Sequence, residues 1–292
     1  MKIKNNRSVA ILMATYNGGR YLAEQIDSII AQSNEDWTLY IQDDGSSDDT
    51  LNIIQKYSSE NKQIVNVNVG LSRQGCCNNF MTLLNMVDSK YYMFADQDDI
   101  WLPEKVQVSL NKLKEIEHDN PDTPIMVFTD RKFIDQEKRS LFPGTTFDPR
   151  KQLAKERIYS VLKTLTTNDF VLLATIAGGN TMLFNQKAKE VSYSYSNIRV
   201  HDSNLLIAVN KAHGIIEPIV QVTVLYRLHE NQTCGIVAYG QRNKIFNRLF
   251  TFFSGNMKMF YIYKLYGGKS IFRFLWYRLR LFYYLRVVLH VF

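Results

Sequence analysis

Three aspartates directly follow one apolar stretch of the chain. In the segment "YYMFADQDDIW", Asp96, Asp98 and Asp99 come behind a run of aromatic and aliphatic residues. In an extended segment, carboxylates two residues apart point to the same side, where they could hold a hard cation such as Mg²⁺ or Mn²⁺. The cation would take its other ligands from water and phosphate oxygens. Aspartates at strand ends also cap helices and turns, and for this spacing alone that interpretation is the commoner one.

Two further polar loops follow apolar runs of the same kind. These loops are "ATYNGG", residues 14–19, and the acidic "QDDGSSDD", residues 42–49. Asp48 or Ser47 could simply cap a helix. Two acidic loops on one sheet would nevertheless repel each other unless they bound cations or hydrogen-bond donors, which a nucleobase, a ribose and a metal diphosphate supply. Neither G-x-G-x-x-G nor G-x-x-x-x-G-K-[ST] occurs, so the sequence supports neither a dinucleotide oxidoreductase nor a P-loop NTPase.

The elements that carry these loops alternate between strand and helix. Apolar periodicity predicts strands at residues 9–14, 37–42, 64–69, 90–95 and 125–130, and helices at about 20–32, 51–57, 77–87 and 103–117. This alternation is typical of an α/β fold with a mainly parallel sheet and helices on both faces. Right-handed crossovers bring the carboxyl ends of such strands to one edge, where ligands bind. We therefore expect the three polar loops to converge.

The second half of the chain is less regular. Between about 135 and 169 we expect a loop around "LFPGTTFDPRK" and a helix near 156–165. A glycine-rich loop then enters a strand at 176–185, a helix covers about 202–212, and a last strand covers "QVTVLYRLH". We find no internal repeat and no low-complexity linker.

Composition limits the class of protein. With 292 residues, 46% of them hydrophobic, the chain can fill a large core. Its three cysteines show no metal-ligand or disulfide spacing, which favours a reducing compartment. The apolar stretch near the N-terminus is too short for a signal peptide and predicts a first strand.

The positive charge lies in the last 52 residues. The chain has a net charge of +7, and residues 241–292 hold ten of its 35 Lys/Arg, none of its 28 Asp/Glu and sixteen aromatic residues. Arginines 273, 278, 280 and 286 interrupt the apolar end, so we expect this tail to lie in the interface of an anionic membrane rather than to span it. Alternatively, it packs on the catalytic domain or on a second copy in a homodimer. Nothing else in the chain resembles a nucleic-acid-binding module.

An ordered set of motifs resembles glycosyltransferase family 2. The set is "VAILMATYNGGRYLAEQIDSI", "IQDDGSSDDT", "FADQDDIWLPEKV", "GGNTMLF", "HD" and "YRLHENQT", and the likeness covers residues 8–235. Within the family it is similar to the branch described as rhamnosyltransferases of bacterial surface polysaccharides. The resemblance implies a GT-A (Rossmann-like) fold, a nucleotide-diphosphate sugar donor, Mn²⁺ or Mg²⁺ as cofactor, and inversion at the anomeric carbon.

The domain organisation follows from the resemblance and from the charge. We expect a GT-A catalytic domain over residues 1–240, with a donor half to about 130 and an acceptor half from 131 onward. A helical, basic and aromatic appendage would cover 241–292.

The resemblance also assigns residues by position. The donor nucleotide would contact Thr15, Tyr16, Asn17, Asp43, Asp44, Arg73 and Asp96. Asp43 would accept from a pyrimidine base, and Asp96 would lie near the ribose and the metal. The expected metal ligands are Asp98 and His229, and Arg227 could neutralise phosphate. A solvated surface residue is the commoner interpretation of Arg73 and of His229 taken alone.

Asp202 is the expected catalytic base, because inversion needs a carboxylate that takes the proton of the acceptor hydroxyl. Without the resemblance, an N-cap would be the preferred role for this aspartate. The residues expected at the acceptor or the sugar are Asp99, Trp101, Gly179, Asn180 and His201. The glycines of "GGNTM" would let the backbone approach a sugar closely, although a tight turn would use them equally.

The expected function is a metal-dependent inverting glycosyltransferase. It would move a sugar to a lipid-linked glycan. The leading donor is dTDP-rhamnose, which would supply L-rhamnose, and a UDP-sugar is the other candidate donor. Its expected place is the cytoplasmic, inner face of the bacterial membrane. The alternatives are a sugar nucleotidyltransferase, whose glycine-rich basic first loop is absent, and a non-catalytic nucleotide-sugar sensor or membrane-docked scaffold.

Overall fold

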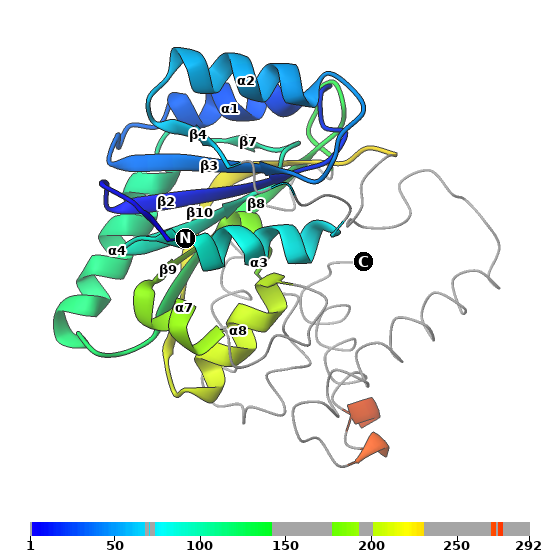
Figure 1. Ribbon diagram of the computed structural model, residues 1–292. Coiled ribbons are helices and arrows are strands. Elements are labelled where there is room, and N and C mark those ends of the chain that lie inside the picture. Colours follow the sequence, from blue (N-terminus) through cyan, green and yellow to red (C-terminus); the bar gives the residue numbers. More distant parts are fainter. Residues whose placement is uncertain are drawn as a thin grey trace. The chain divides into compact units, whose positions relative to one another are not determined.

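The core of the fold is a mixed sheet, seen here in a computed structural model (Figure 1). The structure describes residues 2–67, 70, 74–141, 177–192, 201–230, 270–272 and 274–276. Eight strands form the sheet in the order β4-β3-β2-β6-β9-β8-β10-β7. Their bounds are β2 Val9–Thr15, β3 Trp37–Asp43, β4 Ile64–Asn66, β6 Tyr91–Ala95, β7 Ile100–Trp101, β8 Ile125–Ile134, β9 Met182–Asn185 and β10 Ile215–Arg227. A separate parallel pair joins β1 Ile3–Lys4 to β5 Val87–Asp88.

Most of the strand pairs are parallel, which confirms the predicted α/β sheet. β2 pairs in parallel with both β3 and β6, β3 with β4, and β8 with β10. Two strands run antiparallel to their neighbours. β9 lies between β6 and β8, and β7 pairs with β10. The reversed direction of β9 matters for the site, because its start then lies beside the carboxyl end of β6. The "GGN" segment thereby reaches the edge that carries the acidic loops.

Helices cover both faces of the sheet (Figure 1). They are α1 Leu22–Ile30, α2 Thr50–Glu60, α3 Cys76–Met86, α4 Lys105–Asp119, α7 Gln186–Ser192 and α8 His201–Lys211, with a 3₁₀ turn, η2, at Gly179–Thr181. Apolar residues of α1, α2 and α4 pack on the sheet face that holds Val9, Ile11 and Met13. On the other face, Phe80 of α3 contacts Phe94 of β6. Burial on both faces explains why the central strands are almost continuously apolar.

The predicted elements match these bounds closely where the chain is described. α4 begins at Lys105, so Pro103 precedes the helix rather than lying in its first turn. β4 ends at Asn66, and residues 68–69 lie outside the described part. The loop and helix predicted between 142 and 169 also lie outside it.

The chain divides into two units. The first comprises residues 1–141 and 177–227, and it contains the whole sheet. The second comprises 142–176 and 228–292, of which the structure describes 228–230, 270–272 and 274–276. The boundary at 240 and the helical tail remain predictions. Among the described residues, no helix is both long and apolar enough to cross a bilayer.

A tight turn between α8 and β10 sets the register of the last strand. His213 has a φ of 54°, and Gly214 donates its N–H to the Val209 carbonyl at 2.8 Å. A Cβ at position 214 would lie 2.7 Å from the Val209 Cγ1 and still closer to the carbonyl oxygen of Pro124. Ile215 then donates to that same oxygen, which starts the β10–β8 pairing.

Gly214→Ala should lower the free energy of unfolding by about 1–3 kcal/mol, because the Pro124 backbone cannot move aside without breaking the β10–β8 pairing. His213→Gly is the matched control. It removes a side chain from a left-handed residue and should change stability by less than about 1 kcal/mol. Urea unfolding of both variants measures the difference, and equal stability of Gly214→Ala and the unsubstituted chain would contradict the close approach.

Candidate active site

Asp43 organises the loop that follows β3. Its Oδ1 accepts hydrogen bonds from the Thr15 and Ser46 hydroxyls, at 2.9 and 2.5 Å. Its Oδ2 accepts from the Gly45 and Ser46 backbone N–H groups, at 2.8 and 2.7 Å. The structure thus brings Thr15 and Asp43 together, as expected for two nucleotide contacts. A base N–H would have to compete with these donors for the carboxylate.

Asp44 is used within the protein. Its two oxygens accept from the backbone N–H groups of Gln74 and Gly75, each at 2.8 Å, and the residue is 6% exposed. Asp44 therefore fixes the chain at the start of α3. This arrangement does not favour the nucleotide contact that we expected for it. Arg73, the neighbouring candidate, lies outside the described residues.

Gln97 joins the loops after β2 and β6. Its Oε1 accepts from the Tyr16 N–H at 2.9 Å, and its Nε2 donates to the Tyr16 carbonyl at 3.0 Å. A Cβ on Gly18 would collide with this side chain, which explains the glycine. Asn17 is tied to the β3 loop, since its Oδ1 accepts from the Ser47 N–H at 2.9 Å. The Tyr16 side chain remains 49% exposed and available to a ligand.

Asp96, Asp98 and Asp202 form a carboxylate cluster from both halves of the chain. Gln97 and Asp98 lie in a turn, so the expected extended geometry does not occur. The loops that carry them are nevertheless joined, since Asn180 donates to Asp99 and the neighbouring Gly179 donates to Asp202. Burial, followed by the charges of Asp98 and Asp202, raises the pKa of Asp96 to about 7, while the Arg131 charge acts in the opposite direction. Crowded negative charge of this kind is what a divalent cation relieves.

The carboxylate cluster fits a metal that takes most of its ligands from a substrate. Within the described part of the chain, no group of three or more His, Cys, Asp or Glu is placed to hold a metal ion by itself. Mg²⁺ sites that serve diphosphates commonly use only one or two protein carboxylates. Asp98 and Asp96 could fill that role. His229 is partly exposed just beyond β10, in the second unit.

Asp99 is buried behind the cluster. It is 0% exposed and accepts hydrogen bonds from the Asn180 Nδ2 and from the Arg227 backbone N–H, the latter at 3.2 Å. Burial and the charges of Asp96 and Asp98 raise its pKa well above the usual range. Asp99 thus joins η2 to the end of β10. Its burial does not favour the sugar contact that we expected, and the Asn180 N–H is used here rather than on a ligand.

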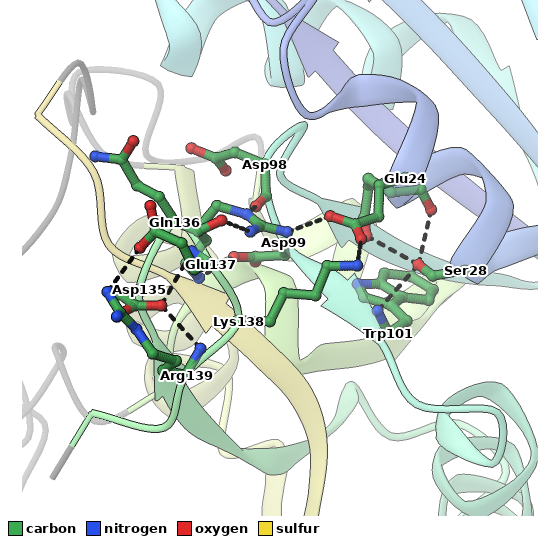
Figure 2. A network of polar contacts seen from close by, with 12 residues as sticks. Glu24, Ser28, Asp98, Asp99, Trp101, Asp135, Gln136, Glu137, Lys138 and Arg139 are labelled. Carbon is green, nitrogen blue, oxygen red and sulfur yellow. Dashed lines mark hydrogen bonds and ion pairs between the residues drawn. The ribbon is translucent and has the colours of Figure 1, made fainter.

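Arg227 holds the acidic turn in place. Its guanidinium donates to the Asp98 carbonyl at 3.0 Å, to the Gln136 carbonyl at 3.1 Å and to the Glu24 carboxylate of α1 (Figure 2). Glu24 also pairs with Lys138. Arg227 is 1% exposed, and its guanidinium lies 4.6 Å from the ring centroid of Tyr21. The arginine is therefore a structural anchor of Asp98, in place of the phosphate contact suggested by the sequence.

Trp101 lies in the hydrophobic core. It is 2% exposed, its backbone N–H donates to the Ser28 hydroxyl at 3.0 Å, and β7 holds it opposite Val224. The Lys105 ammonium sits 4.7 Å from its ring centroid. Burial lowers the pKa of Lys105 to about 7, against the opposing charge of Asp99. This position does not favour a direct contact between Trp101 and a sugar.

Asp202 and His201 begin α8 and face the "GGN" turn. The Asp202 Oδ2 accepts from the Gly179 N–H at 3.0 Å, and its Oδ1 accepts from the Ser203 N–H at 2.5 Å. His201 stacks on Phe80 with ring centroids 4.1 Å apart, and burial lowers its pKa. A Cβ on Gly179 would lie 2.7 Å from the His201 Nε2. The glycine is thus needed for this contact. α8 begins at His201, so Asp202 lies in the first turn of the helix rather than at its N-cap, and the role of catalytic base remains a prediction.

Three residues of the site have no signal in the sequence. The hydrogen-bond partners of Gln97 and Glu24 lie 81 or more residues away in the sequence, and Arg131 contacts aromatic rings. No motif or periodicity identifies these three residues. Only the position of Gln97 between two candidate ligands could have drawn attention to it.

Comparison with known proteins agrees with this arrangement. The family model described as "Glycosyl transferase family 2" matches residues 10–190. The chain is 38% identical over 105 residues to a dTDP-rhamnosyl transferase, RfbG, of Shigella flexneri, a stretch that covers 35% of this chain and 36% of the relative. It is 27% identical over 105 residues to the Escherichia coli protein WfgD, named UDP-Glc:alpha-D-GlcNAc-diphosphoundecaprenol beta-1,3-glucosyltransferase, covering 36% and 40%. The chain thus matches well under half the length of these two relatives.

A solved structure with the same fold extends the comparison. S. aureus TarS, residues 1–349 in complex with UDP-GlcNAc, superposes with a TM-score of 0.56 at 14% identity. The match covers 78% of this chain and 62% of TarS. It shows the GT-A fold. The family model covers more than half of the chain, and it spans the acidic turn and η2; the chain therefore belongs to glycosyl transferase family 2.

Proposed function

We propose that this chain is a metal-dependent, inverting glycosyltransferase that transfers L-rhamnose from dTDP-rhamnose to a lipid-linked glycan. The observation that carries the proposal is the convergence of Asp96, Asp98 and Asp202, from both halves of the chain, at the sheet edge that also holds Thr15 and Asp43. The name of RfbG supports the dTDP-rhamnose donor. The name of WfgD supports a lipid diphosphate acceptor.

The residues divide the chemistry between them. A cation at Asp98 would stabilise the negative charge that develops on the leaving diphosphate. Asp202 would accept the proton of the acceptor hydroxyl on the opposite face of the sugar, as inversion requires. The Gly179 and Ser203 N–H groups hold its carboxylate in one orientation. Gly179 belongs to η2, so the same turn ties the base to the Asp99–Asn180 contact behind the acidic turn.

The proposed place of action is the membrane surface. Residues 241–292 carry ten Lys/Arg, no Asp/Glu and sixteen aromatic residues, a composition suited to anionic head groups. In the described part of this tail, Phe272 is 81% and Trp276 54% exposed. A lipid-linked acceptor would be met at that surface. Packing of the tail on a second copy of the chain is the competing proposal.

The first test measures nucleoside diphosphate release from dTDP-, UDP- and GDP-sugars, with detergent-dispersed lipid-linked glycans as acceptors. We expect turnover of one donor, dTDP-rhamnose, with Mn²⁺ or Mg²⁺, and loss of turnover in EDTA. Turnover that persists unchanged in EDTA would contradict the metal dependence. Turnover of a UDP- or GDP-sugar alone would contradict the assigned donor and leave the enzyme class intact.

Asp98→Asn should abolish the metal-dependent part of nucleoside diphosphate binding, because the amide keeps the shape of the side chain but removes the anionic ligand. Isothermal calorimetry with and without Mn²⁺ measures the effect. Asp122→Asn is the matched control. The Asp122 side chain is 93% exposed, so this substitution removes the same charge at a position away from the site. Equal Mn²⁺ enhancement in both variants would exclude Asp98 as the metal ligand.

Asp202→Asn should lower kcat by about 10²–10⁴-fold, the range for loss of a general base, while the KM of the donor changes little. An asparagine oxygen can still accept from the Gly179 N–H, so a thermal midpoint close to that of the unsubstituted chain is expected alongside the loss. Steady-state kinetics with saturating acceptor measures both constants. A kcat within about threefold of the original would show that another group takes the proton.

A further inference from the structure

Arg131 is a second arginine at the site, and its surroundings differ from those of Arg227. It lies on β8, opposite Val224 of β10. Its guanidinium lies 4.8 Å from the ring centroid of Tyr226 and 5.5 Å from that of Phe133. On a third side it touches Gly178, where a Cβ would overlap the Arg131 Nη1. Two rings and a bare glycine therefore fix the position of this cation.

Among the described residues, the guanidinium N–H groups of Arg131 have no acceptor. Across the described ranges, no oxygen accepts a hydrogen bond from its guanidinium and no carboxylate lies within 4.0 Å of it. Arg227, by contrast, donates to Asp98, Gln136 and Glu24. A guanidinium presents five N–H donors in a rigid fork, and no nitrogen of Arg131 is buried away from solvent, so a ligand can reach these donors. A ligand oxygen would satisfy them.

The charge of Arg131 faces the acidic cluster. It lowers the pKa of Asp96, against the effects of burial, Asp98 and Asp202, and it also lowers that of Tyr226. Arg131 thus acts on Asp96 through its charge, and no ion pair forms between these two described residues. A neighbouring acceptor is also unused, because the Asn180 Oδ1 is buried without a partner and would lie 2.9 Å from a Cβ on Gly178.

We propose that Arg131 binds the diphosphate of the donor nucleotide through its free guanidinium N–H groups. The inference rests on the proposed nucleotide-sugar donor and adds the residue that meets its negative charge. Three carboxylates would repel a diphosphate, so an anion at this edge needs a fixed cation as well as a metal. Arginine suits phosphate oxygens because its fork donates two parallel hydrogen bonds.

The donor is the favoured source of these phosphate oxygens. Asp96, which the Arg131 charge influences, follows β6, and its turn is tied through Gln97 to the Tyr16 loop next to Thr15 and Asp43. Those loops form the nucleotide side of the site. A lipid diphosphate acceptor carries the same chemistry, and the experiment separates the two sources.

The test compares Arg131→Gln with Lys132→Gln in the full chain. Lys132 is the next residue of β8, so its side chain points to the other face of the strand while the same charge is removed. Calorimetry in Mn²⁺ measures binding of dTDP, UDP and the free nucleosides. For Arg131→Gln we expect about 10–100-fold weaker binding of the diphosphate that the unsubstituted chain binds, with nucleoside binding unchanged. Lys132→Gln should bind both as before, and Arg131→Lys should recover part of the loss.

Three results would overturn the proposal. Diphosphate binding by Arg131→Gln within twofold of the original is the first. Equal loss of diphosphate and nucleoside binding is the second, since it would indicate a general disturbance of the site. The third is an unchanged diphosphate affinity with a raised KM for a diphosphate-linked acceptor, which would move Arg131 to the acceptor. If the unsubstituted chain itself binds no nucleoside diphosphate, the proposed donor fails, and the assignment of Arg131 fails with it.

Discussion

The buried guanidinium of Arg227 is the interaction on which the geometry of the site depends. It lies at the end of β10 and connects the Asp98 carbonyl, the Gln136 carbonyl and Glu24 of α1, while its own backbone N–H donates to Asp99. A buried arginine is tolerated only when its N–H groups are bonded, and removing one partner of such a pair generally destabilises a protein by about 3–5 kcal/mol. The acidic turn is therefore held in place through the Asp98 carbonyl and the Asp99 carboxylate.

This anchoring explains how so much negative charge can sit behind a core strand. Asp99 is directed inward to Asn180 and Arg227, and Asp96 and Asp98 remain partly exposed at the edge. Asp202 joins them because β9 runs antiparallel to β6 and brings η2, with Gly179 bonded to Asp202, to the same edge. This negative charge requires positive partners. Arg131 is one of them, and a divalent cation bound at Asp98 is the second that we propose. Catalysis by a glycosyltransferase uses such fixed charges on the leaving diphosphate.

The sequence predicts the sheet well, because alternating apolar and polar segments determine strands, helices and the edge at which their loops meet. The same patterns do not show which side-chain oxygens already accept hydrogen bonds within the protein. Asp43 and Asp44 are neighbours of one type, yet Asp43 accepts hydrogen bonds within its own loop and from Thr15, whereas Asp44 accepts from the backbone at the start of α3. Trp101 and Arg227 resemble ligand residues by position, but β7–β10 pairing and the Glu24 contact bury them. Arg131 differs from Arg227 only through long-range contacts that no local pattern encodes.

The most direct test of the account is a crystal structure of the full chain with Mn²⁺ and the nucleoside diphosphate that it binds, recorded at the manganese absorption edge. The account predicts one anomalous peak at about 2.0–2.6 Å from a carboxylate oxygen of Asp98, bridged to the diphosphate, with the Arg227 contact to the Asp98 carbonyl unchanged. A bound nucleotide with no peak near Asp98, or a turn released from Arg227, would contradict it.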